Sequence, residues 1–245
     1  MPTELELVLS NSSNIKKIKN QTHDLCLIAI ASDWRNLQYI KEQTPELCFA
    51  AIGISPMAIQ YVHKQTPEFC LAAVKKDGTS LRCIKKQNQT PEICFAAVKQ
   101  NAWALQYVCE QTPEICLTAV KKDGDVIRFV HNQTPEICLA AVKKDGDALS
   151  YVFHKTPEIC LAAVKQNGYA LRYVENQTSE ICFAAVSKYG EALCHVKKQT
   201  PEICIEALKT EFRAFQYVAK ELLKDFELAL LYKKNIVADG IKFFI

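Results

Sequence analysis

Apolar residues along the chain fall into short blocks that recur every 22 residues. In the cleanest copy, residues 133–152, an unbroken apolar block from Ile137 to Val142 is followed by Lys-Lys-Asp-Gly and a shorter Ala-Leu-x-Tyr-Val segment. Self-similarity at a short fixed period predicts stacked supersecondary repeats that cannot bury their apolar faces alone. A threonine opens each repeat, in steps of 22 residues apart from one step of 24: Thr22, Thr44, Thr66, Thr90, Thr112, Thr134, Thr156, Thr178 and Thr200.

Each repeat predicts two helices, numbered here by position from its threonine at position 0. The threonine hydroxyl can cap the first helix, proline suits the first helical position, and glutamate at position 2 favours the positive end of the helix dipole. The apolar block continues this helix, and Lys-Lys-Asp-Gly ends it, with glycine predicted to supply a left-handed residue. A shorter second helix is predicted over the Ala-Leu-x-Tyr-Val segment.

These repeats predict an all-α fold, a right-handed α-solenoid of about nine 22-residue helix-turn-helix repeats with degenerate capping repeats at both ends. One continuous repeat domain is expected over residues 1–245, because a repeat array has no separate cores. Within it, residues 1–21 are predicted to form a partial N-terminal cap, 22–221 the nine repeats and 222–245 a degenerate C-terminal cap. Two extra residues near Gln87 and Asn88 predict a local bulge.

The composition disfavours a dedicated nucleic-acid binder and a membrane protein. Thirty basic residues oppose 27 acidic ones, giving a net charge of +3, and the longest apolar runs are far shorter than the ~20 residues of a membrane span. Met1 is followed by Glu4 and Glu6 rather than by a basic and apolar leader, so no secretory signal is expected. The sequence therefore predicts a soluble, cytoplasmic protein with no membrane partner.

Nine of the twelve cysteines share position 4 of the repeat: Cys26, Cys48, Cys70, Cys94, Cys116, Cys138, Cys160, Cys182 and Cys204. Equivalent points on packed helices lie roughly 8–10 Å apart, too far for a disulfide. We therefore expect buried, reduced thiols in a reducing compartment. A metal or redox surface is the alternative, but the chain has no C-x-x-C motif and no histidine at a matching position. No metal and no cofactor is predicted.

The other three cysteines, Cys83, Cys109 and Cys194, fall in or just after the second helix and are expected to be more exposed. Cys194 and His195 form an adjacent thiol–imidazole pair. Neighbouring helical residues do not face each other, so no catalytic pair is predicted there. The chain is not expected to be an enzyme.

The run from Thr156 to Val174 resembles a known family. It reads Thr-Pro-Glu-Ile-Cys-Leu-Ala-Ala-Val-Lys-Gln-Asn-Gly-Tyr-Ala-Leu-Arg-Tyr-Val. The Ala-Ala-Val-Lys-Gln-Asn-Gly core together with the Ala-Leu-x-Tyr-Val tail is similar to an uncharacterised helical-repeat family abundant in giant DNA viruses of amoebae, over residues 22–221. The resemblance implies an α-helical repeat fold and a viral origin, hence the host cytoplasm or the virion. It implies no catalytic residue.

Charged residues form two rows along the predicted array. Glutamate at position 2 and lysine at positions 9 and 10 are both explained by the electrostatics of helix ends. The alternative is a lysine edge that binds an acidic partner or phosphates. Its members would be Lys75, Lys76, Lys99, Lys121, Lys122, Lys143, Lys144, Lys165 and Lys188.

The repeats differ most at positions 13 and 16, which lie three apart and so on one face of the second helix. Position 13 holds Arg35, Met57, Thr79, Trp103, Asp125, Asp147, Tyr169, Glu191 and Arg213. Position 16 holds Gln38, Gln60, Arg82, Gln106, Arg128, Ser150, Arg172, Cys194 and Gln216. Exposed Trp, Tyr, Met and Arg are typical of binding anchors. The predicted partner-binding residues are Met57, Arg82, Trp103, Gln106, Arg128, Tyr169 and Arg172.

The function predicted from this pattern is a non-catalytic protein–protein interaction scaffold with a protein partner that the sequence does not name. Single-stranded RNA read one repeat per base is an alternative, disfavoured by the small net charge and by the acidic residues Asp125, Asp147 and Glu191 in the same column. A structural or self-assembling role is the third alternative, and a solvated face without any partner remains open at each position.

Overall fold

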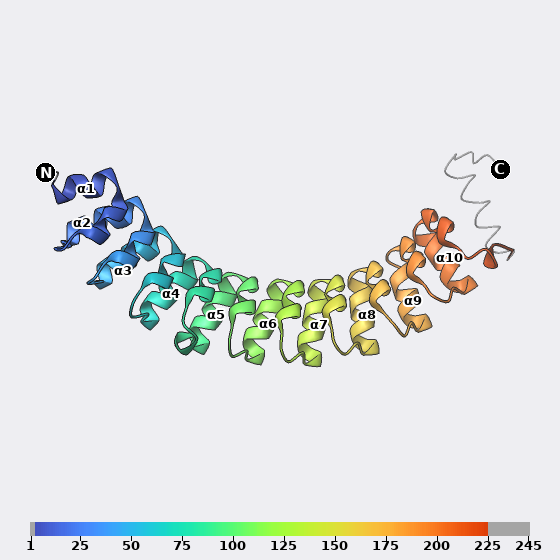
Figure 1. Cartoon of the computed structure of the whole chain (residues 1–245). Helices are drawn as coiled ribbons and strands as arrows, with labels where there is room; N and C mark the ends of the chain where they lie inside the picture. The colour runs from blue at the N-terminus through green and yellow to red at the C-terminus, as the bar shows by residue number, and fades with distance from the viewer. Residues whose placement is uncertain (1–2, 225–245) are drawn as a thin grey trace. The chain divides into compact units, whose positions relative to one another are not determined.

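The protein is described by a computed structural model that covers residues 3–224. Within these residues every regular element is a helix, and α-helices alternate with 3₁₀ helices labelled η (Figure 1). The chain divides after Ala119 into two compact units, which are treated separately below. Except for the short 3₁₀ helix η12, the predicted C-terminal cap lies outside the described residues.

The first unit contains α1 to α5, five full 3₁₀ helices and one short insertion, and its boundary falls inside α6. The elements are α1 (Glu4–Ser10), η1 (Ser12–Lys17), α2 (His23–Ser32), η2 (Trp34–Tyr39), α3 (Pro45–Ile54), η3 (Pro56–Tyr61), α4 (Pro67–Lys76), η4 (Gly78–Cys83), η5 (Lys86–Asn88), α5 (Pro91–Gln100), η6 (Ala102–Tyr107) and α6 (Pro113–Lys122).

The second unit continues the alternation to the end of the described residues. Its elements are η7 (Gly124–Phe129), α7 (Pro135–Lys144), η8 (Gly146–Tyr151), α8 (Pro157–Gln166), η9 (Gly168–Tyr173), α9 (Ser179–Val186), η10 (Gly190–His195), α10 (Pro201–Thr210), η11 (Phe212–Tyr217) and η12 (Leu222–Lys224).

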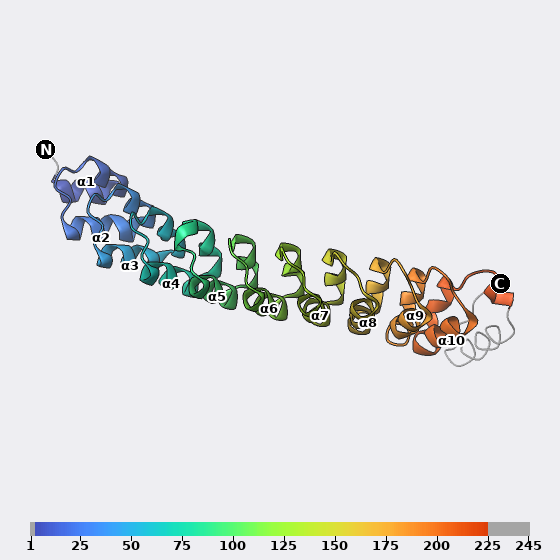
Figure 2. The ribbon, with the colours of Figure 1, turned by 90° about the horizontal axis from the view of Figure 1, so that it is seen from below.

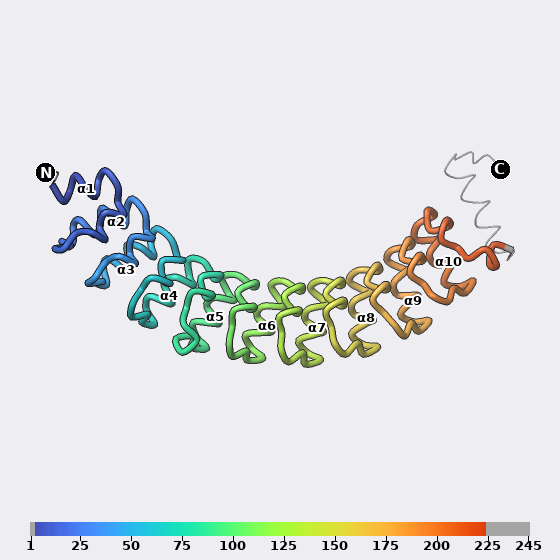
Figure 3. Tube along the Cα trace, in the orientation of Figure 1, coloured from blue at the N-terminus to red at the C-terminus, as the bar shows by residue number. Residues whose placement is uncertain are grey.

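Each unit has two layers, which confirms the predicted α-solenoid. In the second unit α7 packs on α8, α8 on α9 and α9 on α10, while η7 to η11 pack on one another in the same order. Figure 2 shows the α-helices of this unit along one side and the 3₁₀ helices along the other. In the second unit extended segments lead from the 3₁₀ helices to the next α-helix, as after η8 (Figure 3). A single domain and the right-handed superhelix stay predictions.

The core lies between the two layers and uses the same positions in each repeat. In α7 the buried residues are Ile137, Cys138, Ala141 and Val142, and in η8 they are Gly146, Ala148 and Leu149. Small alanines allow the helices to approach closely. Because a ten-residue helix is marginal in water on its own, stability depends on contacts between repeats.

The α-helices begin where the threonines predict. In α7 the Thr134 hydroxyl accepts the N–H of Ile137, and Pro135 occupies the first helical turn. The bond is 3.4 Å long, beyond the usual 2.9–3.0 Å, so this cap contributes weakly. Thr22 and Thr66 make no such side-chain bond.

The second helix of each described repeat is a six-residue 3₁₀ helix. Except after α9, where Ser187 and Lys188 form a turn, a single extended residue both ends the α-helix and begins the 3₁₀ helix. Asp145 does so after α7: its backbone N–H donates to Ala141, and its carboxylate accepts the N–H of Asp147. The Asp or Asn of the Lys-Lys-Asp-Gly segment is therefore a cap for the second helix.

The prediction of a left-handed glycine after the first helix is wrong. Gly146 is the first residue of η8, and its φ lies outside the left-handed range. A Cβ there would lie 2.7 Å from the Ala163 carbonyl oxygen of the next α-helix. Glycine is needed because two backbones approach closely, as also at Gly78, Gly124, Gly168 and Gly190.

The two extra residues form the predicted bulge as one additional 3₁₀ turn. This turn, η5, lies between η4 and α5, and the Asn88 amide donates to the Gln65 side-chain oxygen at 3.3 Å. The inserted turn is therefore bonded to the glutamine at the start of its own repeat.

Candidate partner-binding face

Positions 13 and 16 of the repeat are the second and fifth residues of each 3₁₀ helix, and we call them the outer row. A 3₁₀ helix has three residues per turn, so side chains three apart lie directly above one another. All seven predicted binding residues lie at the surface. Met57 and Tyr169 are half-buried, whereas Arg82, Trp103, Gln106, Arg128 and Arg172 are exposed.

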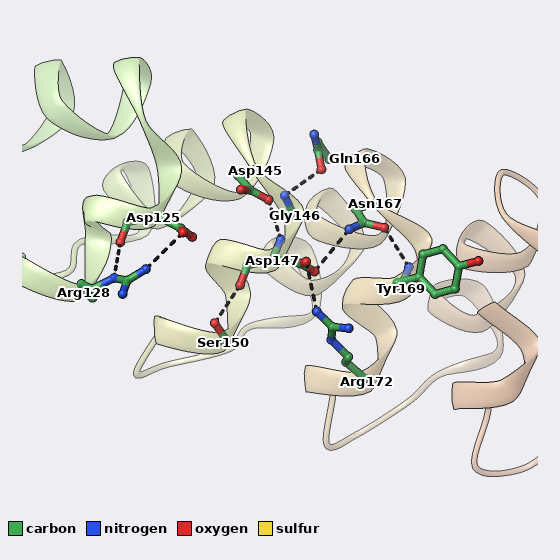
Figure 4. Close-up of polar contacts among 10 residues, drawn as sticks. All are labelled: Asp125, Arg128, Asp145, Gly146, Asp147, Ser150, Gln166, Asn167, Tyr169 and Arg172. Carbon is green, nitrogen blue, oxygen red and sulfur yellow. Dashed lines mark hydrogen bonds and ion pairs between the residues drawn. The ribbon is translucent and has the colours of Figure 1, made fainter. Parts of the chain in front are cut away.

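The caps of the 3₁₀ helices fix where the outer row begins. The side chain of Asn167 accepts the backbone N–H of Tyr169 at 3.1 Å, as Asp145 does for Asp147 at 2.9 Å (Figure 4). The next two residues are buried, as Ala170 and Leu171 are in η9. The cap bond before an outer-row residue and the buried residues after it therefore fix the position of its backbone.

Neighbouring repeats contact each other through the outer row. Arg172 places Nη2 3.0 Å from the Asp147 carboxylate of the preceding repeat (Figure 4). The other carboxylate oxygen of Asp147 accepts from the Asn167 amide at 3.3 Å. Both partners of the ion pair are partly exposed, so it orients the side chains more than it stabilises the fold.

Arg128 is held by its own repeat and by the next. Its Nε donates to the Asp125 carbonyl at 3.0 Å and Nη2 to the Asp125 carboxylate at 3.1 Å (Figure 4). Its guanidinium lies 4.2 Å from the centroid of the Tyr151 ring, a favourable cation–π distance.

Tyr169 is the centre of an aromatic cluster. Its hydroxyl donates to the Glu191 carboxylate at 3.2 Å, and its ring centroid lies 5.8 Å from that of Tyr189 and 6.2 Å from that of His195. Burial and the bond to Glu191 raise the pKa of Tyr169. Burial and the charge of Arg172 lower the pKa of His195.

The outer row of the first unit contains no acidic residue. The Met57 sulfur lies 3.7 Å from Nη2 of Arg82 and 3.7 Å from Sγ of Cys83. In η6 the Gln106 amide donates to the Trp103 carbonyl at 2.9 Å, and 37% of Trp103 is exposed. This unit therefore presents sulfur, indole and guanidinium groups at its surface.

The glutamine that precedes all but one of the repeat threonines has a role that the sequence-based predictions missed. The amide of Gln133 donates to the Ile127 carbonyl at 3.2 Å and to the Tyr151 carbonyl at 3.0 Å, and its oxygen accepts the Phe153 N–H at 2.9 Å. One side chain thus joins the backbones of two successive repeats, and we call this arrangement the glutamine bridge. Its recurrence was the available signal: Gln21, Gln43, Gln65, Gln89, Gln111, Gln133, Gln177 and Gln199.

Two lysines of the predicted lysine edge, Lys76 and Lys188, serve the stacking of repeats. At position 10, Lys76 donates to the Gly53 carbonyl of the preceding α-helix, and Lys188 donates to the Lys165 and Gln166 carbonyls at 3.1 and 3.0 Å. The Gln166 side chain at the same position accepts the Gly146 N–H at 2.7 Å (Figure 4). These residues satisfy helix carbonyls and amides that lack partners in their own helix.

The glutamates at position 2 also act on their own helices. Backbone N–H groups and the Thr44 hydroxyl lower the pKa of Glu46, and the Thr66 hydroxyl and the backbone lower that of Glu68. Helix capping therefore accounts for Glu46 and Glu68, and for the acidic row as a whole it stays a prediction.

The nine cysteines at position 4 are buried and unpaired, as predicted. Six of them contact the glutamine five residues earlier, as Sγ of Cys204 does at 3.5 Å from the Gln199 side-chain oxygen. Burial raises the pKa of the Cys70, Cys94 and Cys204 thiols to about 11. These sulfurs are therefore thiols, and not nucleophilic thiolates, at neutral pH.

We expect thiol labelling of the native protein at pH 8 to separate the cysteines. Cys109 is exposed and should react first, followed by Cys194, whose thiol pKa is raised by burial. The nine at position 4 should react only after denaturant is added. Absorbance at 412 nm with Ellman's reagent measures both phases, and rapid labelling of nine or more thiols would contradict the burial.

Metal clusters and membrane-spanning helices are both absent from residues 3–224. No group of three or more His, Cys, Asp or Glu side chains in this range could hold a metal ion. No helix among the same residues is long and apolar enough to cross a membrane.

Comparison with known sequences places this architecture in a family. The chain matches the family described as a domain of unknown function (DUF4116) over residues 44–89, 112–156, 134–178 and 156–200, together more than half of its length. The chain belongs to the DUF4116 family. Each DUF4116 match covers about two 22-residue repeats, so the unit of comparison is a pair of stacked repeats. No curated protein and no solved structure matches the chain.

Proposed function

We propose that this DUF4116 chain is a non-catalytic protein–protein interaction scaffold that binds its partner through the outer row. The observation that carries the proposal is a surface row of Trp, Tyr, Met and Arg within repeats that otherwise keep the same residues. These residue types are enriched among the anchors of protein interfaces. In the first unit the anchors are Met57, Arg82, Trp103 and Gln106, and in the second they are Arg128, Tyr169 and Arg172.

The contacts of the outer row support this role. Arg128, Tyr169 and Arg172 are already oriented by Asp125, Glu191 and Asp147. A side chain held in its binding geometry loses less conformational entropy when a partner docks, which improves affinity without new contacts. The same bonds stay at the rim of an interface, where exposed ion pairs favour specificity.

The same contacts count against RNA as the ligand. Arg128 and Arg172 both have carboxylates within 3.1 Å, and these would repel phosphates. A one-base-per-repeat code also needs similar side chains at equivalent positions, whereas Asp125, Asp147 and Glu191 interrupt the row. A protein partner needs no such uniformity.

As part of this proposal, the chain works in a reducing, cytoplasmic compartment. Its twelve unpaired cysteines support this, because exposed thiols such as Cys109 are oxidised in secreted proteins. The resemblance to repeats of giant amoebal viruses supports the host cytoplasm or the virion as that compartment.

We expect the double substitution Trp103→Ala with Tyr169→Ala to weaken partner capture by about 30-fold or more, since interface anchors contribute about 2 kcal/mol or more. Each substitution removes one aromatic anchor from one unit and leaves the buried layers intact. To measure the effect, immobilised protein is incubated with an extract of the native cell, with and without RNase. Quantitative mass spectrometry then measures the captured partner.

The matched control is Ile54→Ala with Phe183→Ala. These side chains are 51% and 44% exposed on α3 and α9, away from the outer row, so capture should be unchanged. Equal loss in both double variants would refute the outer row. Loss of capture on RNase treatment would favour RNA as the ligand. Capture of further copies of the same protein by the bait would favour self-assembly.

A further inference from the structure

One repeat lacks the glutamine bridge. Before Thr156 the bridging position holds Lys155, whereas the flanking repeats have Gln133 and Gln177. Gln177 makes the full set of bonds, to the Leu171 carbonyl at 3.3 Å, the His195 carbonyl at 2.9 Å and the Lys197 N–H at 2.8 Å. A lysine ammonium has donors only and cannot replace the accepting oxygen.

Backbone groups that a glutamine would bond are therefore left over. By equivalence with Gln133 and Gln177 they are the Leu149 and Tyr173 carbonyls and the Glu175 N–H. Among residues 3–224, the Lys155 ammonium and the Glu175 N–H have no hydrogen-bond acceptor. Two donors that make no hydrogen bond thus lie at one junction.

A cavity of about 250 Å³ occupies this junction. Its lining includes Phe153, His154, Lys155, Cys160, Glu175 and Asn176. Lys155 is half-buried and lines the cavity together with Cys160. At the rim, the Phe153 ring is 66% exposed.

We infer that this junction binds the carboxylate of an acidic side chain in an extended peptide that has an apolar neighbour. The carboxylate would accept from the Lys155 ammonium and from the Glu175 N–H, and the apolar neighbour would cover Phe153. A charge-assisted pair of this kind is about twice as strong as a neutral one. A single carboxylate suits the site better than a phosphate, because the Glu175 carboxylate in the lining opposes a second negative charge.

The inference rests on the proposed role of the chain as a protein-binding scaffold and adds a contact outside the outer row. Of the nine junctions before a threonine, this one alone carries lysine in place of glutamine. Because only this junction carries the lysine, it would determine where along the chain the acidic residue of the peptide binds.

The test follows the Glu175 amide resonance in ¹⁵N-labelled full-length protein. The probes are N-acetyl-Phe-Glu-Phe-amide, its glutamine counterpart N-acetyl-Phe-Gln-Phe-amide, and inorganic phosphate. We expect saturable shifts with the glutamate peptide, at least 10-fold weaker binding of the glutamine peptide, and weaker binding of phosphate. Equal binding of the two peptides, tighter binding of phosphate, or no shift would each overturn the inference.

Two variants keep the test independent of folding. Lys155→Gln restores the bridge of the other repeats, so it should fold at least as well as the wild type and lose the response. Lys155→Met keeps the cavity and removes the charge, and it should lose the response too. A response retained in either variant would refute the role of Lys155.

Tyr169→Ala separates this inference from the proposed function. If Tyr169→Ala keeps both the Glu175 response to the peptide and normal partner capture, the outer row is refuted and the carboxylate site stands. If Tyr169→Ala loses partner capture and the wild type shows no Glu175 response, the carboxylate site is refuted and the outer row stands.

Discussion

Replacing Gln133 by alanine is expected to lower the free energy of unfolding by about 2–3 kcal/mol. The substitution removes three hydrogen bonds to the backbone, each of which contributes about 0.5–1.5 kcal/mol net. The bonds join two successive repeats, so their loss acts on the interface on which stability depends. Urea denaturation followed by circular dichroism at 222 nm measures the change.

Two substitutions control for the loss of a glutamine side chain. Gln60 is exposed and donates only to the Met57 carbonyl one turn earlier, so Gln60→Ala should change stability by less than about 0.5 kcal/mol. Lys155→Gln should raise stability by about 1–2 kcal/mol, because it adds the missing bonds. Equal midpoints for Gln133→Ala and Gln60→Ala would show that the bridge is not structural.

Gly146→Ala is expected to lower the free energy of unfolding by about 2–3 kcal/mol. The added methyl would lie 2.7 Å from the Ala163 carbonyl oxygen and 2.9 Å from Cβ of Asn167, so α8 must shift away from η8. Ala102 occupies the equivalent position before α6, which shows that a repeat can be spaced for a methyl. In the repeat of Gly146, the same shift would disturb the existing packing of η8 against α8.

Gly53→Ala is the matched substitution with the opposite sign. Gly53 lies inside α3 and is exposed, and a methyl group added there would have no atom of another residue within 4 Å beyond its own helix turn and chain neighbours. Alanine in an exposed helix interior stabilises by about 0.5–1 kcal/mol relative to glycine. The two variants should therefore differ by about 3 kcal/mol in the same denaturation experiment. Similar effects of both would refute the close approach at Gly146.

The period of the sequence was enough to predict the repeats, their helical class and the starts of the α-helices. Burial of the cysteines also followed, because position 4 lies inside an apolar block in every repeat. The seven predicted binding residues of the outer row lie at the surface as expected, since positions three apart share a face in either kind of helix. Their binding role stays a prediction.

The sequence did not distinguish an α-helix from a 3₁₀ helix in the second half of the repeat. An apolar pair followed three residues later by valine suits both, and 3₁₀ helices longer than three or four residues are uncommon. For the glycine, a left-handed residue and a close backbone approach both require a missing Cβ. Pro56 at the equivalent position was the signal against the first, because proline fixes φ near −65°.

The glutamine bridge was hidden for a different reason. Its partners lie 6 residues before it and 18 and 20 residues after it, and all of them are backbone groups. Backbone groups leave no trace in residue identity. Only the recurrence of glutamine marked the position. The exception at Lys155 marks the one repeat that lacks the bridge.

Hydrogen exchange of the protein with its captured partner is the decisive test of the outer row. We predict slowed exchange in peptides that cover η6, residues 102–107, and η9, residues 168–173, with α5 and α8 unchanged. Protection confined to the α-helices, or no protection of either 3₁₀ helix by a bound partner, would contradict the proposed binding face.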